Sequence, residues 1–379
     1  MELRTFSFEP GDGWSTTEFP DLDSERTLVI VFAAPAYMDK PAVFSELIRA
    51  YPKSKLIGCS TAGEIAGSLV QDDSLSVAVL KLERSSIAVV SAEIRQAADS
   101  LAVGEQLARQ LSRDDLCSVF ILSDGLHVNG SELVKGFNSV LAPNVVVTGG
   151  LAGDGDRFQR TWVIRNGRPE TGMITATGFY GTSLQITHGS RGGWEGFGPE
   201  RRVTRSQGNI LYELDGRPAL ALYKKYLGQR ASGLPSTGML FPLAIRQDGA
   251  DSCQRVRTIL GVDEASQSMT FAGDIPNGYL AQLMRTNFDN LLYGAGAAAD
   301  QARGSMAVTG PALAIAISCV GRRMVLGERI EEETEITLGN MPEGTQQVGF
   351  YSYGEIAPYP SGACDLHNQT MTLTTFSEA

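Results

Sequence analysis

Four side chains near the C-terminal end of the chain carry the clearest chemistry. Tyr353 and Glu355 follow Tyr351 at alternate positions of an expected strand, so we expect all three on one face. A loop rich in proline and glycine then leads to His367 and Asn368, before the last expected strand. A phenol, a carboxyl, an imidazole and an amide at one strand end suit the recognition of a small polar ligand. Hydrogen bonding that only closes the loop is the alternative.

A serine nucleophile is the second chemistry to consider. Residues 58–62 nearly match the G-x-S-x-G turn that presents a catalytic serine, with Ser60 in the middle, but Ala62 stands where the second glycine belongs. A base would have to come from the three histidines, His127, His188 and His367. A hydrolase that uses Ser60 is therefore the enzyme alternative to a ligand-binding protein.

Metal and nucleotide signatures are weaker. The wide spacing of the histidines favours no zinc-type cluster, although a single histidine is enough to ligate a haem iron. Residues 294–299 match G-x-G-x-x-A, but they follow an expected helix, whereas a dinucleotide-binding turn follows a strand. The glycine-rich loop 149–156 either cradles an anion with its backbone N–H groups or makes a tight turn between strands.

Dense basic spots are few in this acidic chain. They are Arg201 and Arg202 with Arg205, and the pair Arg322 and Arg323. Because arginine pairs with carboxylates through two parallel hydrogen bonds, either spot is a candidate for a carboxylate-bearing ligand. Ion pairs with the chain's own acids explain them equally well.

The composition narrows the class of protein. The chain has 379 residues, of which 32 are basic and 43 acidic, for a net charge of −11, and this argues against nucleic acid as the main ligand. The most apolar stretch, 308–320, is too short to span a membrane. The N-terminus lacks the pattern of a secretory signal. The five scattered cysteines are expected to be reduced and mostly buried, as in a cytoplasmic protein.

The elements that must position these residues alternate between strands and helices. Apolar or β-branched runs predict strands at 27–34, 55–60, 75–82, 86–94, 118–125, from 144, and in the last 70 residues. Apolar stripes predict helices at 43–51, 101–111, 213–228 and 280–292. Residues 1–25 are expected to be irregular.

Short connections predict antiparallel strand pairs within this pattern. Residues 83–85 separate two strands, and Asn166 with Gly167 is a strong hairpin signal. We therefore expect an α/β fold with an α+β tendency, in which two closely packed lobes have mixed sheets flanked by helices. No long repeat is apparent, although the triplet Gly-Glu-Ile occurs at both 63–65 and 354–356.

Several of these segments resemble the FIST family (F-box and intracellular signal transduction proteins). Residues 58–65 (GCSTAGEI) and 149–158 (GGLAGDGDRF) resemble its N domain, which we place at 26–214. Residues 212–228, the arginine-rich segment 317–327, expected as a strand, and the segment from 350 to 374 resemble its C domain, which we place at 215–376. The resemblance adds Arg322 and Asp215 to the candidate ligand-binding residues, as polar residues within C-domain motifs.

The resemblance implies sensing rather than catalysis. FIST modules occur in bacterial signalling proteins and are thought to bind small ligands such as amino acids. Because the two domains fill the chain, we expect a stand-alone protein that signals by contacting a partner. A purely structural role and an enzyme remain the alternatives.

Stand-alone bacterial members resemble the haem-containing nitric-oxide sensors of the NosP type, which regulate a partner histidine kinase. On that resemblance, haem is an expected cofactor, and an amino acid or other metabolite is the alternative ligand. The expected axial ligand is His188, which precedes Gly189 at an expected strand end. Arg191, Arg201 and Arg202 could meet the propionates, and His127 is the next choice of ligand.

Overall fold

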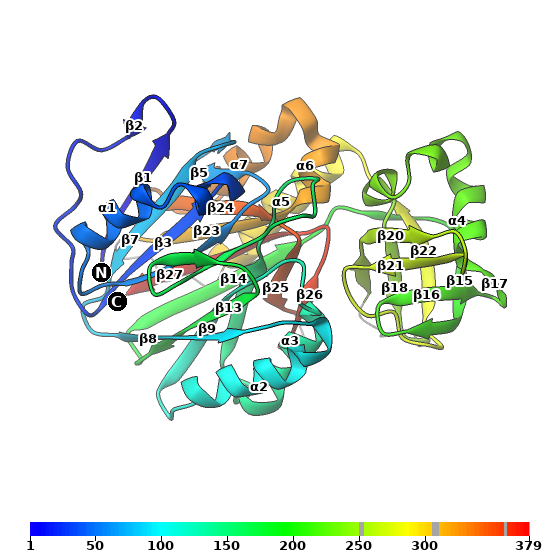
Figure 1. Cartoon of the computed structure of the whole chain (residues 1–379), viewed down its shortest axis with the longest axis horizontal. Coiled ribbons are helices and arrows are strands. Elements are labelled where there is room, and N and C mark those ends of the chain that lie inside the picture. Colours follow the sequence, from blue (N-terminus) through cyan, green and yellow to red (C-terminus); the bar gives the residue numbers. More distant parts are fainter. Residues whose placement is uncertain (250–253, 305–310, 360–361, 379) are drawn as a thin grey trace.

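The structure, a computed structural model, describes residues 1–249, 254–304, 311–359 and 362–378. Figure 1 shows a large body and a smaller lobe beside it. The lobe is an insertion, because it begins with β15 (Glu195–Gln207) and ends with β22 (Leu280–Arg285), while the chain before and after it builds the body. The prediction of an α/β fold with two lobes and mixed sheets is confirmed.

The N-terminal sheet has the strand order β12-β11-β4-β3-β7-β1-β2. Its strands are β1 (Glu2–Glu9), β2 (Gly13–Trp14), β3 (Thr27–Ala33), β4 (Lys55–Ser60), β7 (Leu75–Lys81), β11 (Val163–Arg165) and β12 (Arg168–Glu170). The parallel strands β3 and β4 are joined by α1 (Ala42–Ala50). Val43, Phe44 and Leu47 form the apolar stripe of α1 and pack on one face of this sheet.

The middle sheet has the order β26-β25-β10-β9-β13-β8. Its strands are β8 (Ser86–Glu93), β9 (Leu116–Ser123), β10 (Val146–Leu151), β13 (Met173–Tyr180), β25 (Gly354–Pro358) and β26 (Cys364–His367). The parallel strands β9 and β10 are joined by α3 (Gly130–Val140), which packs with α2 (Ser100–Leu111) against one face of the sheet (Figure 1).

The C-terminal sheet has the order β14-β27-β23-β24-β5-β6. Its strands are β5 (Glu64–Ala66), β6 (Leu69–Gln71), β14 (Leu184–Arg191), β23 (Leu313–Cys319), β24 (Gln346–Ser352) and β27 (Met371–Glu378). The parallel strands β23 and β24 are joined through α6 (Val320–Leu326) and α7 (Ile330–Gly339), and α5 (Phe288–Arg303) packs across β14 and β27.

The remaining faces of the three sheets meet in one apolar core. Phe32 of the N-terminal sheet lies 4.7 Å from Phe350 of the C-terminal sheet, measured between ring centroids. Phe120 of the middle sheet lies 6.4 Å from Phe376 of the C-terminal sheet. All four rings are fully buried in a single cluster, so burial of apolar surface holds the sheets together.

The three sheets repeat one plan. Each has a parallel strand–helix–strand unit, after which the chain crosses to a neighbouring sheet: β5 pairs with β24, β11 with β4, and β25 with β10. The two Gly-Glu-Ile triplets lie at two of these crossings, at the starts of β5 and β25. Strands from the segments that resemble the N domain therefore pair with strands from those that resemble the C domain, in the same sheets.

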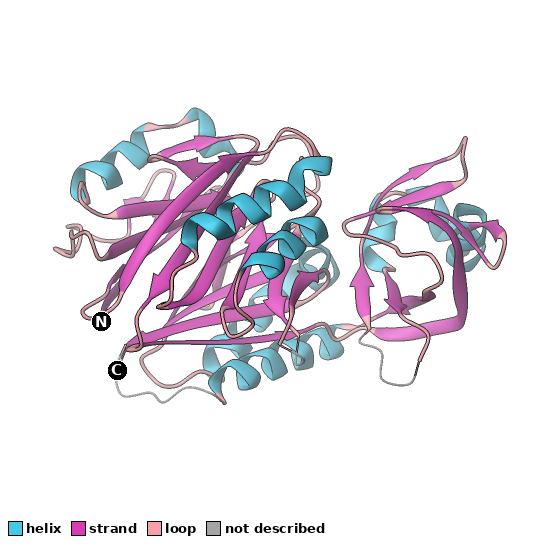
Figure 2. Cartoon of the chain, turned by 90° about the horizontal axis from the view of Figure 1, so that it is seen from below, coloured by secondary structure: helices cyan, strands magenta, loops and turns pink. Residues whose placement is uncertain are grey.

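The lobe has its own sheet and its own core. Its strands, in the order β19-β18-β22-β15-β16-β21-β20 with β17 beside β16, include β16 (Ile210–Leu214), β17 (Arg217–Pro218), β18 (Leu243–Arg246), β19 (Arg255–Arg257), β20 (Ile259–Asp263) and β21 (Ser268–Phe271). One helix, α4 (Ala219–Leu227), packs on them with Leu220 and Tyr223. Figure 2 shows the lobe as a separate unit beside the body. Leu214 is the last residue of β16, and Asp215 begins the turn before β17.

Several expected elements differ from the observed ones. Residues 1–25 were expected to be irregular, but Glu2–Glu9 forms β1, which pairs along its length with β7. The expected helix 280–292 is a strand at Leu280–Arg285 and a helix only from Phe288, because Asn287 caps the helix by accepting a hydrogen bond from the Asn290 N–H. Similarly, the expected helix 213–228 is helical only from Ala219.

The antiparallel hairpin expected across residues 83–85 is also wrong. β7 pairs with β1 and β3 in the N-terminal sheet, whereas β8 pairs with β13 in the middle sheet. Where the connection crosses between the sheets, the Glu378 carboxylate accepts hydrogen bonds from the N–H groups of Glu83, Arg84 and Ser85 at 2.7–3.0 Å and so holds the turn in place. The Asn166-Gly167 hairpin between β11 and β12 is confirmed, with both residues at positive φ.

Two expectations from composition concern the cysteines and the membrane. Of the cysteines in the described part of the chain, Cys59, Cys319 and Cys364 are buried free thiols and Cys117 is a half-buried one. Cys253 lies outside the described residues. Within the described ranges, no helix combines the length and apolar character that crossing a membrane requires.

Candidate functional site

A cavity of about 400 Å³ lies between the body and the lobe, and we name it the lobe cavity. The body contributes the end of β14 with the following linker, one residue of α5, the end of β25, and the turn between β26 and β27. The lobe contributes residues next to the start of β19 and the end of β22. The lining residues are Ser190, Arg191, Gly192, Gly193, Trp194, Gln254, Val256, Met284, Gln301, Pro358, Tyr359, His367, Asn368 and Thr370. The predicted residues His367 and Asn368 both belong to this wall.

Asn368 is the unusual group in the lobe cavity. It lies in the turn between β26 and β27, where Gln369 adopts a positive φ of 65°. Its side chain is only 1% exposed, yet neither the amide oxygen nor the amide nitrogen has a hydrogen-bond partner among the described residues. A buried amide without partners costs about 1–3 kcal/mol. The turn therefore holds an unpaired donor and an unpaired acceptor beside the cavity, buried in its wall.

His367 is held as a neutral imidazole next to Asn368. Burial lowers its pKa to about 4, so the ring carries no charge at neutral pH. The Nε2 atom lies 2.9 Å from the carbonyl oxygen of Ala357, and because a carbonyl only accepts, Nε2 carries the proton. The Tyr359 ring covers the imidazole at 4.5 Å between centroids. This histidine contributes shape and polarity rather than charge.

Glu355 lies behind the lobe cavity and not in its wall. Its fully buried carboxyl accepts hydrogen bonds from the Ser352 hydroxyl at 2.7 Å and from the Thr370 hydroxyl and N–H at 2.9 and 3.1 Å. Burial raises the pKa of Glu355 to about 8, so the carboxyl is largely protonated at neutral pH. Thr370, which does line the cavity, connects this carboxyl to the cavity wall.

The described wall of the lobe cavity carries a positive charge and no carboxylate. Arg191 is exposed at the end of β14 and is the one fully charged side chain among the described lining residues. No aspartate or glutamate belongs to that part of the wall. Trp194 supplies an aromatic face, oriented by its indole N–H, which donates to the Gln369 carbonyl at 3.0 Å. The cavity thus offers hydrogen bonds, aromatic surface and one positive charge.

Tyr353 lies apart from this cavity, and the expectation that Tyr351, Tyr353 and Glu355 share one strand face is wrong. The strand breaks at Tyr353, where the chain leaves the C-terminal sheet (β24) for the middle sheet (β25). Tyr351 donates to Glu333 at 2.9 Å, while Tyr353 donates to the Asp154 carboxylate and to the Gly155 carbonyl. The break was invisible in the sequence because both strands satisfy the same apolar pattern.

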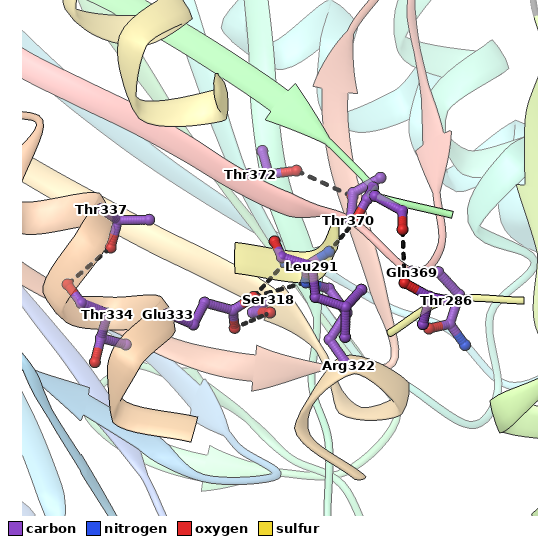
Figure 3. A network of polar contacts seen from close by, with 12 residues as sticks. Thr286, Leu291, Ser318, Arg322, Glu333, Thr334, Thr337, Gln369, Thr370 and Thr372 are labelled. Atoms are coloured by element: carbon purple, nitrogen blue, oxygen red, sulfur yellow. Dashed lines mark hydrogen bonds and ion pairs between the residues drawn. The ribbon is translucent and has the colours of Figure 1, made fainter. Parts of the chain in front are cut away.

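Arg322 is a buried structural residue on α6, and not on a strand as expected. Figure 3 shows its guanidinium beside the Glu333 carboxylate, with which it forms a fully buried ion pair. It also donates to the backbone carbonyls of Leu291 and Gly192. Glu333 further accepts from the Ser318 hydroxyl at 2.8 Å. With its donors engaged, Arg322 supports the lobe cavity from behind, through Gly192.

Asp215 lies far along the lobe, in the turn before β17. Its carboxylate accepts from the Arg201 guanidinium and from the Arg202 N–H, both at 2.9 Å. These bonds lower the pKa of Asp215. Arg202 also pairs with Asp248 at 2.6 Å. Asp215 does not line the lobe cavity, and the basic spot at Arg201 and Arg202 forms ion pairs within the lobe.

A second cavity, of about 530 Å³, is built from the family-like motifs, and we name it the motif cavity. Its wall includes Thr61, Ala62, Gly63, Glu64, Asp72, Asp73, Gly155, Asp156, Arg157 and Arg323. Glu64 accepts from Thr61 and from Ser74, and burial raises its pKa to about 7. Arg323 pairs with Asp72 at 2.6 Å and donates to the Ala62 carbonyl. Its buried polar groups are thus already bonded to one another.

His188, the expected haem ligand, lies on a strand of the C-terminal sheet. It lies on β14 opposite Thr374, burial lowers its pKa, and its Nδ1 has no partner among the described residues. The imidazole therefore has a nitrogen without a partner in the described part of the chain, but His188 lines neither cavity. His127 is bonded to Asp124 at 3.0 Å. Across the described residues, no group of three or more His, Cys, Asp or Glu side chains is arranged for a metal ion.

Ser60 is poorly placed for attack on a substrate. It is the last residue of β4, is fully buried, and its hydroxyl accepts a hydrogen bond from the Trp162 N–H at 3.1 Å. No hydrogen bond joins it to a histidine within the described residues. The geometry of a nucleophile with an adjacent base is therefore not seen there.

Sequence reasoning missed most of the lobe-cavity wall. Trp194, Gln301 and Met284 come from segments more than 60 residues away from Asn368, and only the insertion of the lobe brings them together. The pair Gly192 and Gly193 before Trp194 was the available signal, since it marks the linker at which the chain leaves the body for the lobe.

Both halves of the chain match domains of a known protein family. Residues 27–217 match the FIST N domain and residues 219–358 match the FIST C domain. An uncharacterized protein of Methanocaldococcus jannaschii is 26% identical over 214 residues, which cover 53% of this chain. The match spans only 40% of that relative's length.

Proposed function

The chain belongs to the FIST family, and on that premise we propose that it is a sensory protein of signal transduction that binds a small polar ligand in the lobe cavity. FIST domains are associated with small-ligand sensing in signal transduction, and the family is a ligand-binding one rather than a known family of enzymes. The family supports the class of function, and the residues of the lobe cavity support the choice of site.

The unpartnered amide of Asn368 carries the proposal. Native proteins pair more than about 90% of their buried polar groups, so a buried amide with neither atom paired is exceptional. A ligand that accepts from the amide nitrogen and donates to the amide oxygen removes the desolvation cost. Thr370 and Ser190 line the same cavity and add hydroxyl groups for the same ligand.

The charges around the cavity favour a neutral or negatively charged ligand. Arg191 can pair with a carboxylate, whereas an ammonium group finds no carboxylate among the described lining residues. Burying an unpaired ammonium is costly. We therefore propose a small carboxylic acid or amide, with its carboxylate toward Arg191 and its remaining polar atoms toward Asn368.

The position of the cavity explains how binding would be transmitted. Ligand contacts to Asn368 in the body and to Val256 or Met284 in the lobe would join the two parts. The adjacent Gln369 already donates to the Met239 carbonyl at 2.9 Å and to the Thr258 hydroxyl at 3.0 Å, both in the lobe. A ligand that adds contacts across this boundary selects one orientation of the lobe, which a partner can read.

Thermal unfolding of the purified protein with a ligand panel tests this function. The panel contains short carboxylates (lactate, succinate, glutarate), a matched amide (succinamide) and a matched diamine (putrescine). We expect at least one carboxylate or amide to raise the melting temperature in a saturable manner, and putrescine to have no effect through this site. A panel response that is unchanged when Asn368 is replaced would overturn the site.

Two substitutions locate the response. Asn368→Leu removes the unpaired amide at similar volume, so it abolishes the ligand response while the ligand-free protein becomes equally or more stable. Asn144→Leu changes an exposed asparagine elsewhere and serves as the control. Arg191→Gln weakens carboxylates by about tenfold and leaves succinamide unchanged.

An amino acid is the alternative ligand, and the motif cavity favours it. The carboxylates of Asp73 and Asp156 and the guanidinium of Arg157 border that cavity, so an ammonium and a carboxylate would both find partners. Stabilisation by amino acids that is lost in Asp156→Asn but retained in Asn368→Leu would assign the sensing to the motif cavity instead.

Haem-based nitric-oxide sensing with a partner histidine kinase in the cytoplasm stays a prediction from the family resemblance. The unpartnered Nδ1 of His188 favours it, whereas the position of His188 outside both cavities disfavours it. Its test is the absorption spectrum of protein produced with a haem supply. A Soret band that His188→Ala removes would support this alternative, and protein without such a band would exclude it.

A further inference from the structure

A groove of about 420 Å³ crosses the boundary between the lobe and the body, and we name it the arginine groove. The lobe supplies Arg230, Leu240, Phe241 and Arg285, and the segment that returns to the body supplies Thr286, Asn287 and Phe288. Met324 and Val325 of α6 complete the wall. None of the residues singled out for ligand binding belongs to it.

The floor of the arginine groove is apolar and accessible. The exposed fraction is 41% for Phe288 and 38% for Met324, whereas most apolar side chains of this size are buried in this protein. Phe241 and Leu240 extend the same surface into the lobe. Contiguous apolar surface of this kind marks a site of protein interaction more often than scattered apolar residues do.

The charge of the arginine groove is opposite to that of the molecule. Arg230 stacks on Phe241 at 5.2 Å and Arg285 stacks on Phe197 at 5.2 Å. Neither guanidinium forms an ion pair with a described residue, although the chain has 43 acidic side chains and pairs many other arginines. No aspartate or glutamate is among the described residues of the groove. These arginines are thus free to pair with acids from outside.

We propose that the arginine groove binds an acidic peptide segment of a partner protein, with an aromatic or aliphatic side chain of that segment on Phe288 and Met324. Two guanidinium groups beside an apolar floor match carboxylates that flank an apolar side chain. Arginine and aromatic residues are also the types that dominate binding energy at protein interfaces. This docking site is independent of which ligand the lobe cavity takes.

The position of the groove suits a signalling contact. Arg285 follows Met284, which lines the lobe cavity, and Met324 lines both the arginine groove and the motif cavity. A partner seated there contacts the lobe and the body together, so its affinity depends on their relative orientation.

The probe for this site is a synthetic fluorescein-labelled peptide in which aspartate and glutamate flank a central phenylalanine and leucine. Fluorescence anisotropy with the full chain should show saturable binding that weakens as salt is added. A peptide with lysine at the acidic positions, and an acidic peptide with serine at the two apolar positions, should each bind at least about tenfold more weakly. Equal binding of either control peptide would overturn the proposal.

Variants of exposed residues connect that binding to the arginine groove. The double substitution Arg230→Glu with Arg285→Glu should weaken the acidic peptide at least about tenfold without lowering the melting temperature. Arg49→Glu reverses the charge of an exposed arginine on α1 and should leave the affinity unchanged. Phe288→Ser should weaken the peptide while the charges stay in place.

Three results would count against an acidic partner segment. Wild-type affinity in the double variant would show that the peptide binds elsewhere. A wild-type dimer that the double variant converts to a monomer, measured by light scattering, would show that a second copy occupies the groove. Absence of any saturable binding to the wild type would also reject the proposal.

Discussion

Glu64 and Glu355 occupy equivalent places in two repeats of the fold, but their surroundings differ. Each follows a hydroxyl residue by three positions and accepts its hydrogen bond, from Thr61 and Ser352 respectively. Each also accepts from the N–H and hydroxyl of one further residue, Ser74 for Glu64 and Thr370 for Glu355. Burial raises both pKa values, to about 7 and about 8.

The difference lies in what completes each region. Beside Glu64, polar groups of the motif cavity are bonded to one another, since Arg323 pairs with Asp72 and donates to the Ala62 carbonyl. Beside Glu355, the lobe is inserted into the chain, and in the turn that supplies Thr370 the amide of Asn368 has no partner among the residues that the structure describes. Both carboxyls are thus part of the framework, and the proposed function places ligand binding only where the repeat meets the lobe.

The largest effect expected from this comparison concerns two neighbours on α6. Arg322 is fully buried and bonded to Glu333, whereas Arg323 faces the motif cavity and pairs with the exposed Asp72. Arg322→Met should cost about 3–5 kcal/mol of unfolding free energy, because it leaves a buried carboxylate without its partner. Arg323→Met should cost about 1 kcal/mol or less.

Denaturant unfolding of both variants measures this difference directly. A double variant, Arg322→Met with Glu333→Leu, should recover most of the loss, since it removes both charges together. Equal costs for the two single variants would show that the buried pair is not formed as described.

The next effect is the pH dependence of stability. Because the folded pKa of each glutamate is raised above its usual value of 4.5, its stabilising contribution is complete below that value and is lost as pH rises through the folded pKa. Glu355→Gln should therefore flatten a fall in stability on the order of 4 kcal/mol between about pH 5 and 8, and Glu64→Gln a fall on the order of 3 kcal/mol between about pH 5 and 7.

Unfolding free energies from pH 5 to 9 test this in wild type and in both variants. Glu355→Gln should also weaken the response to lobe-cavity ligands while the protein stays folded, whereas Glu64→Gln should not. A wild-type slope that persists in both variants would mean that other groups carry the titration.

A smaller effect should separate the two glycines that precede these carboxyls. Gly63 has φ of +132°, and an added Cβ would meet the Arg323 guanidinium, whereas Gly354 has an ordinary φ and would meet only the ends of leucine side chains. Gly63→Ala should cost about 1–2 kcal/mol more than Gly354→Ala, which thermal unfolding can resolve. The reverse order would contradict the role assigned here to the positive φ of Gly63.

The sequence predicted those parts of the fold that local patterns determine. The apolar run of β3, the stripe of α1 and the Asn166-Gly167 turn were all correctly identified. The crossing at Tyr353 and the strand at 280–285 were missed, because the choice between sheets depends on which distant strand has a free edge. No local periodicity contains that information.

The candidate site was predictable to a similar extent. Polar residues crowded at a strand end identified His367 and Asn368 as a pair, and both line one cavity. Tyr353 was assigned to the same cluster because the sequence does not show that the chain changes sheets there. Arg322 and Asp215 stood out as charged residues within motifs, but their ion pairs with Glu333 and Arg201 form only in the fold.

The most direct test of the central claim is calorimetric titration of the best-stabilising carboxylate or amide of the panel into wild type, Asn368→Leu and Asn144→Leu. The account predicts one binding site in wild type and in Asn144→Leu, and an affinity reduced by more than about tenfold in Asn368→Leu, a protein that unfolds at an equal or higher temperature without ligand. Unchanged affinity in a well-folded Asn368→Leu variant would contradict the lobe cavity as the sensing site.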